Sequence, residues 1–219
     1  METLAYAELF ALQDRVLSTI FSVETTFYLT GGTCLHRFHD QRRYSVDLDL
    51  FTNDHALFRD DVRTVQEALS SASLSHTQQV DSRDFVRLWI QPGLQLDLVN
   101  DRGYRYGKSV LSPQGFVLDN ELNICANKLC AILGRDDPKD VFDLFTVFEH
   151  GQTDWETVMT AAARKCVLDP EVLELRLSSF PLELLDLLAL KDPGTLHEIK
   201  QGYPRMVEHL LSQTLTSTL

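Results

Sequence analysis

The sequence is short of cysteine, of positive charge and of long apolar runs. Four cysteines occur among 219 residues, and none of them forms the C-x-x-C pair of a structural zinc site. No apolar run approaches the roughly 18 residues that a membrane span needs. The first residues also carry acid where a signal peptide carries positive charge. These absences predict a reduced, cytoplasmic protein with no membrane partner.

Acidic residues outnumber basic ones, since 32 Asp and Glu against 20 Lys and Arg give a formal net charge of −12. A field of that sign repels a phosphate backbone, which argues against DNA as a partner but leaves room for a local basic site. Between residues 140 and 199 there are 12 acids and 4 bases, whereas residues 37–108 hold 11 acids and 10 bases. We therefore expect a phosphate-handling site in the nearly neutral N-terminal part.

Hydrophobic periodicity predicts an α+β fold, with a short mixed sheet flanked by helices and followed by a helical bundle. In the first half we expect helices at 3–20, 33–39 and 54–69, strands at 25–29 and 45–51, and a hairpin of 85–90 and 94–99. In the second half we expect helices at 120–133, from Asp137-Pro138 onward, and near 153–165, 169–178, 181–190 and 203–213. The predicted domains are an α/β core over residues 1–118 and a helical region over 119–219.

The segment from Arg43 to Phe51 contains two carboxylates in an alternating strand pattern. Val46, Leu48 and Leu50 are predicted to point to one face, and Asp47 and Asp49 to the other, about 7 Å apart along the backbone. Like charges this close repel each other unless a cation lies between them, and hard oxygen ligands at this spacing suit Mg²⁺. For the pair taken alone, a solvated strand face is the competing interpretation.

A Gly-Gly-Thr sequence, Gly31 to Thr33, stands between a predicted strand and a predicted helix. Glycines let a backbone approach a phosphate closely, and the start of a helix offers free N–H groups. The alternative is a plain turn, which is the commoner role of such a sequence.

A third acid, Asp97, lies in the second strand of the predicted hairpin. If that hairpin pairs beside the strand of Asp47 and Asp49, three carboxylates converge. Two could then bridge metal ions while the third deprotonates an attacking hydroxyl, the layout of metal-assisted nucleotidyl transfer. Taken alone, Asp97 is better explained as an exposed edge-strand acid, and the combination of all three reverses that preference.

Together these motifs resemble the polymerase-β-like minimal nucleotidyltransferase superfamily, and more closely the AbiEii/AbiGii-type nucleotidyltransferase toxins. The resemblance covers roughly residues 25–148 and includes the Arg-x-Ser-x-Asp-hydrophobic-Asp-hydrophobic-Phe pattern of residues 43–51. It also includes a helical lysine, Lys128, followed by Lys139-Asp140-Val141-Phe142-Asp143-Leu144. The resemblance implies catalytic roles for Asp47, Asp49, Asp97, Lys128 and Asp143, metal binding by Asp47, Asp49 and Asp97, and nucleotide binding by Gly31, Gly32, Thr33, Arg43, Ser45 and Lys128.

The helical residues also have an interpretation of their own. Lys128 and Arg135 are two helical turns apart, so they share a face that could present two cations to a triphosphate. For Asp140 and Asp143, orienting or capping local groups is as good an explanation as catalysis. His36 and the nearby His39 are predicted to be neutral surface histidines.

Several bases flank the acidic motifs and are interleaved with Tyr104 and Tyr106. This mixture could guide the 3′ end of an RNA through phosphate contacts and stacking, or it could be an ordinary solvated loop. The bases are Arg37, Arg42, Arg43, Arg102, Arg105 and Lys108.

The function predicted from the sequence is Mg²⁺-dependent transfer of NMP from an NTP to an acceptor hydroxyl. By resemblance the enzyme is a toxin that modifies tRNA or another cellular acceptor, with an antitoxin as its partner. Two alternatives are nucleotidylation of a protein or of a small molecule such as an antibiotic, and a non-catalytic interaction protein on the same fold.

Overall fold

The computed structural model describes residues 5–216, which form two compact units. The first unit comprises residues 5–34, Ser45–Arg102 and Ser109–Asp119, and the second comprises Leu35–Tyr44, Gly103–Lys108 and residues 120–216. Two short stretches from the N-terminal half, 35–44 and 103–108, thus belong to the same unit as the C-terminal helices. The predicted domain division between residues 118 and 119 stays a prediction.

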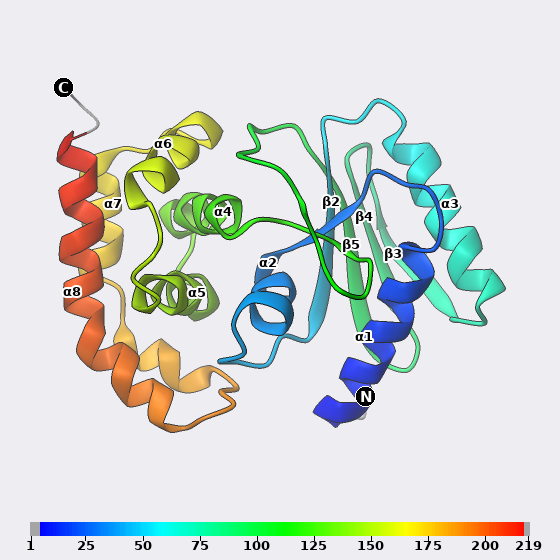
Figure 1. Cartoon of the computed structure of the whole chain (residues 1–219), viewed down its shortest axis with the longest axis horizontal. Helices are drawn as coiled ribbons and strands as arrows, with labels where there is room; N and C mark the ends of the chain where they lie inside the picture. The colour runs from blue at the N-terminus through cyan, green and yellow to red at the C-terminus, as the bar shows by residue number, and fades with distance from the viewer. Residues whose placement is uncertain (1–4, 217–219) are drawn as a thin grey trace. The chain divides into compact units, whose positions relative to one another are not determined.

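The first unit is built on a mixed sheet flanked by helices, as the sequence predicts, and the sheet has seven strands in the order β3-β4-β5-β2-β1-β7-β6. The strands are β1 (Tyr28–Thr30), β2 (Asp47–Asn53), β3 (His76–Asp81), β4 (Phe85–Ile90), β5 (Leu94–Asp101), β6 (Val110–Leu111) and β7 (Val117–Leu118). β2 pairs parallel with β5 and antiparallel with β1, so it lies in the interior of the sheet (Figure 1).

The alternation of β2 and β5 gives the sheet one apolar face. Leu48 and Leu50 of β2 and Leu96 and Leu98 of β5 are completely buried. Helix α1 (Tyr6–Ile20) packs against β5 and against α3 (Phe58–Ser71), and both helices bury apolar side chains. The predicted helix start at residues 3 and 4 lies outside the described residues. Val46, which we expected beside Leu48, is 45% exposed because β2 begins one residue after it.

Three strands were not expected from the sequence. β3 has the polar sequence His-Thr-Gln-Gln-Val-Asp, lies at the edge of the sheet and is mostly exposed. An exposed edge strand needs no apolar alternation, and polar residues at an edge discourage pairing with other chains. β6 and β7 have only two residues each, too few to produce a pattern.

The second unit is a helical bundle around α4 (Glu121–Gly134). α4 contacts α5 (Pro138–Glu149), α6 (Trp155–Lys165) and α7 (Pro170–Ser178), and the long α8 (Gly194–Thr216) packs against α5, α6 and α7 (Figure 1). The core of the bundle is apolar and includes Leu129, Phe142 and Phe145, all fully buried. The predicted C-terminal helical bundle is confirmed.

Local capping chemistry explains where several of these helices begin. Asp137 caps α5, because its carboxylate accepts a hydrogen bond from the backbone N–H of Lys139 at 2.9 Å, and Pro138 takes the first helical position.

The predicted helix near 181–190 is instead a 3₁₀ turn, Leu182–Leu187, after which Leu190 forms a β-bridge with Arg43. The last helix begins at Gly194 rather than near residue 203, and it continues through Pro204.

Two short elements carry the chain from β1 toward β2. Helix α2 (Gly31–Cys34) follows β1 directly, and a π-helical turn, Leu35–His39, follows α2. Together they confirm the short helix predicted at 33–39. Within residues 5–216, each helix is too short or too polar to cross a lipid bilayer.

We expect Leu50→Ala to destabilise the protein by about 2–5 kcal/mol, since it removes buried atoms from the central strand and leaves a cavity. Leu57→Ala, at a leucine that is 57% exposed in the same unit, should change the free energy of unfolding by less than about 0.5 kcal/mol. Chemical unfolding followed by circular dichroism measures both changes. Equal effects of the two substitutions would contradict the placement of β2 in the core.

Candidate active site

The first unit presents Asp47 and Asp49 on one face of β2. Along the strand, partly exposed residues alternate with buried ones, so the two aspartates face away from the side on which Leu48 and Leu50 are buried. This is the arrangement that the alternating sequence pattern predicts.

Asp97 of β5 lies directly beside Asp49, because the two strands pair in parallel with these residues in register. The pairing that a convergence of three carboxylates requires is therefore present. Asp97 is 7% exposed, less than expected for an edge-strand acid, because β5 lies between β2 and β4.

An arginine that the sequence analysis did not single out, Arg87 of β4, binds Asp97. The two residues are opposite each other in the antiparallel pairing of β4 with β5. Arg87 Nε donates to Asp97 Oδ1 and Arg87 Nη2 donates to Asp97 Oδ2, both at 2.7 Å. The hydrogen bonds and charge of Asp97, together with the charges of Asp49 and Asp47, raise the pKa of Arg87. The hairpin predicted from the sequence could have revealed this contact. Residues 87 and 97 are equally far from its turn, so an antiparallel pairing places them opposite each other.

Gly31 lets the Asp49 carboxylate approach the turn between β1 and α2. Its φ of +69° lies in the left-handed region that side chains avoid, and a Cβ atom added there would lie 2.5 Å from Asp49 Oδ2. The requirement for glycine at this position is therefore steric as well as conformational, and it fixes the turn against a predicted site residue.

Thr33 and Ser45 hold the beginning of β2 in place. The buried hydroxyl of Thr33 donates to the backbone carbonyl of Asp47, and Ser45 Oγ donates to Asp47 Oδ1 at 3.4 Å. Gly32, between Gly31 and Thr33, is buried as well. In this structure the Gly-Gly-Thr segment thus supports β2, while its expected contacts with a nucleotide remain a prediction.

The carboxylates of Asp47 and Asp49 fit a hard divalent cation, because Mg²⁺ accepts one or two protein carboxylates and completes its shell with water and phosphate oxygens. Their alternation on one strand face supplies that pair. In contrast, both oxygens of Asp97 already accept hydrogen bonds from Arg87. Among residues 5–216, no group of three or more His, Cys, Asp or Glu is arranged to hold a metal ion.

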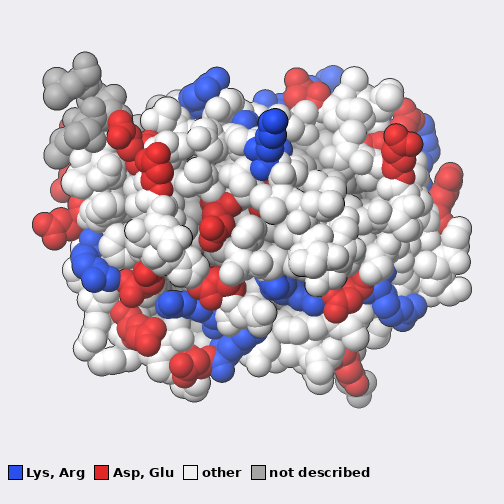
Figure 2. Space-filling model, in the orientation of Figure 1, with Lys and Arg blue, Asp and Glu red and all other residues white. Residues whose placement is uncertain are grey.

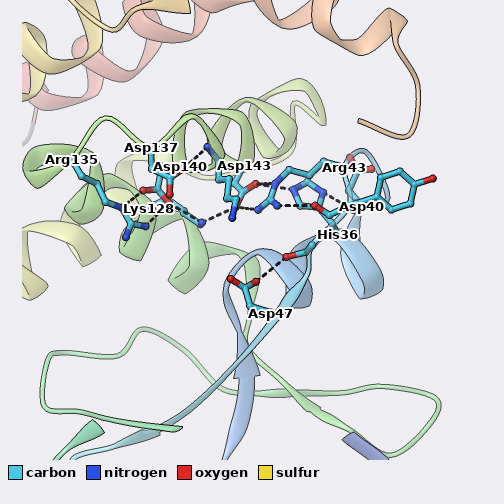
Figure 3. A network of polar contacts seen from close by, with 12 residues as sticks. His36, Asp40, Arg43, Asp47, Lys128, Arg135, Asp137, Asp140 and Asp143 are labelled. Atoms are coloured by element: carbon cyan, nitrogen blue, oxygen red, sulfur yellow. Dashed lines mark hydrogen bonds and ion pairs between the residues drawn. The ribbon is translucent and has the colours of Figure 1, made fainter. Parts of the chain in front are cut away.

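The second unit contains a buried carboxylate, Asp143 of α5, surrounded by cationic and polar groups (Figure 3). Arg43 binds it through two hydrogen bonds, from Nε to Oδ1 at 2.7 Å and from Nη2 to Oδ2 at 2.9 Å. Lys128 Nζ lies 2.7 Å from Asp143 Oδ2, and His36 Nε2 lies 2.8 Å from Oδ1. Burial alone would raise the pKa of Asp143, but the charges of Lys128 and Arg43 hold this pKa well below its usual range.

A second buried carboxylate, Asp140, extends this network by one helical turn. Lys128 Nζ donates to Asp140 Oδ1 at 2.9 Å, and Arg135 Nε donates to Asp140 Oδ2 at 2.7 Å. Burial alone would lower the pKa of Lys128, but the charges of Asp143 and Asp140 outweigh it and raise this pKa. Lys128 and Arg135 share Asp140 as a partner, but Arg135 follows the last residue of α4 with an extended backbone, so the helical face that their spacing predicts is not what brings them together.

The prediction that His36 is a surface histidine is wrong. Its side chain is completely buried, and Nδ1 lies 3.1 Å from the backbone carbonyl of Asp40 while Nε2 contacts Asp143. Burial lowers the pKa of His36, and the hydrogen bond with Asp143 offsets part of that effect. His39, in contrast, is partly exposed. A short polar helix gave no sign in the sequence of which histidine would face α5.

Several of the bases that flank the acidic motifs are engaged in ion pairs. Arg42 Nε lies 3.2 Å from Asp40 Oδ2, and Arg102 binds both Asp84 and Asp54. The ring of Tyr104 stacks against the guanidinium of Arg164, whose Cζ lies 3.6 Å from the ring centroid. Ion-paired bases have less charge to offer a phosphate backbone, so these contacts favour the solvated-loop interpretation over RNA guidance.

Comparison with known proteins supports the prediction that the protein is a nucleotidyltransferase. The family model described as nucleotidyl transferase AbiEii toxin, type IV TA system, matches residues 15–107. No curated protein sequence matches the chain.

The chain is similar to several solved structures, among them JHP933 and MenT4. JHP933 from Helicobacter pylori is 20% identical with a TM-score of 0.59, over 99% of this chain and 98% of that one. MenT4, a nucleotidyltransferase toxin from Mycobacterium tuberculosis H37Rv, is 18% identical with a TM-score of 0.51, over 72% of this chain and 63% of its own. At these identities the similarity establishes the fold, and for JHP933 it extends over the C-terminal helices.

Gly31→Ala should destabilise the protein by about 1–2 kcal/mol, the cost of placing a side chain in the left-handed region, plus the clash with Asp49. Gly134→Ala is the matched control, because no heavy atom lies within 4 Å of the added Cβ. We expect it to be neutral or slightly stabilising in thermal unfolding. A Gly31→Ala protein as stable as the control would contradict the described turn.

Asp143→Asn should lower the free energy of unfolding by about 3–5 kcal/mol at pH 7, because it leaves buried cations without their counter-charge. Asp186→Asn, which removes an exposed partner of Lys200, should have little effect. The pKa of Asp143 is lowered by folding, so its contribution is complete above the unfolded value of about 3.9 and is lost as the pH falls through the folded value. Urea unfolding should give a constant difference between wild type and Asp143→Asn from pH 7 to 5 and a smaller one below about pH 4. A difference already shrinking between pH 7 and 5 would contradict this assignment.

Proposed function

We propose that this protein transfers NMP from an NTP to the hydroxyl of a cellular acceptor, with Mg²⁺ as cofactor, because residues 15–107 match the model of the AbiEii nucleotidyltransferase toxin family. The observation that carries this proposal is the register of β2 and β5, which places Asp49 beside Asp97 and leaves Asp47 on the same strand face. A cluster of carboxylates on a strand face, with a glycine turn against it, suits a metal-bound triphosphate.

In the proposed reaction an acceptor oxygen attacks the α-phosphorus in line, a new P–O bond forms, and the bond to pyrophosphate breaks. Asp47 and Asp49 would hold the metal, which neutralises charge on the phosphates when it is bound. Asp97 is proposed to complete the metal site and to act as the base that takes the proton of the acceptor hydroxyl. Gly31, Gly32 and Thr33 are proposed to contact the phosphates, and Ser45 to orient Asp47. Positioning and charge stabilisation would provide most of the rate enhancement, as in phosphoryl transfer generally.

The roles proposed for Arg43, Lys128 and Asp143 rest on the family resemblance. Within the second unit these three side chains form one buried ion-pair network. The network fixes the lysine in one orientation, but it also pairs Lys128 Nζ with Asp140 and Asp143, so the role of Lys128 in countering triphosphate charge is proposed on the resemblance and not on these contacts. Arg43 and Asp143 are better suited to orient that lysine than to contact a nucleotide themselves, because both are buried and paired with each other.

For the acceptor we propose a tRNA 3′ end first and a protein or small molecule second. The toxin family supports a cellular target and an antitoxin partner. The net charge of −12 favours the second alternative, and in the view of Figure 2 acidic and basic side chains are interspersed. A non-catalytic interaction protein is the least supported alternative, because all three strand aspartates are present.

A label-transfer assay tests the proposal with Mg²⁺, each of four α-labelled NTPs, and total tRNA, cell protein or an aminoglycoside as acceptor. We expect wild type to label one class of acceptor and Asp49→Asn to lower the rate at least about a hundredfold, as expected on losing a main electrostatic contributor. Asp81→Asn, at an exposed aspartate of β3 that pairs with Arg59, should keep the wild-type rate. Equal rates for all three proteins would refute the proposed site. Labelling of protein or aminoglycoside alone would refute tRNA as the acceptor.

A further inference from the structure

In the first unit a positively charged side chain, that of Arg87, lies beside the strand aspartates. Arg87 lies opposite Asp97 and forms two parallel hydrogen bonds with it, the bidentate geometry in which arginine binds carboxylates most strongly. Gln95 Nε2 adds a third donor, 3.3 Å from Asp97 Oδ2. Both oxygens of Asp97 are therefore occupied by N–H donors from the protein itself.

Arg87 interacts with the other two acids as well. The charges of Asp49 and Asp47 each add to the effect of Asp97 in raising the pKa of the Arg87 guanidinium. The side chain is 34% exposed, and its Cζ lies 5.4 Å from the centroid of the Phe85 ring on the same strand. A guanidinium so placed relieves the repulsion among three neighbouring carboxylates, which would otherwise raise the energy of the empty site.

The same contacts oppose the binding of a metal ion. A carboxylate oxygen that accepts a hydrogen bond from a guanidinium offers less electron density to a metal, and a second positive charge nearby repels one. We propose that Arg87 is an internal counter-ion that competes with the divalent cation for Asp97, so that it must move off Asp97 before the metal site is complete. This makes Arg87 a positioning residue that sets how much metal the site requires, and the inference rests on the proposed function.

Mn²⁺ binding provides a test that needs no turnover. Free Mn²⁺ is titrated by electron paramagnetic resonance against wild type, Arg87→Gln and Arg87→Lys, with no nucleotide present. We expect Arg87→Gln to bind Mn²⁺ about tenfold more tightly than wild type, a factor typical of coupled binding equilibria. Arg87→Lys keeps the charge but loses the two-point contact, so its affinity should lie between the other two.

Arg59→Gln is the matched control for the loss of one positive charge. Arg59 is in the same unit and pairs with Asp81 on the exposed strand β3. Its substitution by Gln therefore removes one positive charge at a position away from Asp47, Asp49 and Asp97. It should bind Mn²⁺ as wild type does. A gain by Arg59→Gln equal to that of Arg87→Gln would overturn the inference, as would an Arg87→Gln affinity no higher than wild type.

The variant Asp47→Ala/Asp49→Ala separates failure of this inference from failure of the proposed function. If wild type binds Mn²⁺, the double variant does not, and Arg87→Gln shows no gain, only the role of Arg87 is refuted. If neither wild type nor Arg87→Gln binds Mn²⁺, the metal site itself is refuted and the inference falls with it. Circular dichroism verifies folding, and should Arg87→Gln prove unfolded, Arg87→Lys decides by the same comparison with wild type.

Discussion

The parallel pairing of β2 with β5 is the constraint on which the first unit depends. It buries Leu48, Leu50, Leu96 and Leu98 on one face of the sheet and, because side chains alternate, places the aspartates on the other. A shift of one residue would bury carboxylates and expose leucines, so the hydrophobic core itself fixes the acidic residues in register. The same interaction thus determines both the stability of the sheet and the geometry of its charged face.

Each unit balances its acidic residues in a different way. In the second unit Asp140 and Asp143 are buried and satisfied by Lys128, Arg43, Arg135 and His36, so the network is a rigid part of the bundle. In the first unit Asp47 and Asp49 stay partly exposed on the strand, and Arg87 neutralises only the neighbouring Asp97. Removing a partner from a buried network leaves a charge without compensation, whereas a partly exposed pair can exchange its partner at lower cost. This difference is why we propose that a metal ion displaces an arginine in the first unit and not in the second.

The comparisons and the geometry support each other at different levels. The family match covers residues 15–107, which include the Gly-Gly-Thr turn, β2, β4 and β5. Similarity to JHP933 extends over the helical bundle, although it establishes the fold alone. The family match therefore includes the three strand aspartates of the proposed site, and the acceptor remains the part of the proposal that the label-transfer assay must decide.

The sequence by itself determined the local features whose cause is local. Alternation in residues 45–51, the turn after Ile90 and the Asp137-Pro138 start of a helix each follow from side-chain period or backbone preference. The sequence also identified Asp47, Asp49 and Asp97 as a group. It missed β3, because an exposed edge strand carries no apolar pattern. It also predicted a helix over 181–190, where only a 3₁₀ turn forms.

Only the tertiary structure decided which charged groups meet. Arg87 faces Asp97 because β4 and β5 pair in one register, and His36 is buried because a short helix packs against Asp143, 107 residues further along the chain. Partners so distant in sequence leave no periodic signal, because their proximity depends on how whole elements pack. The sequence therefore determined which residues are candidates for the proposed chemistry, and the fold decided which of them are held by a partner.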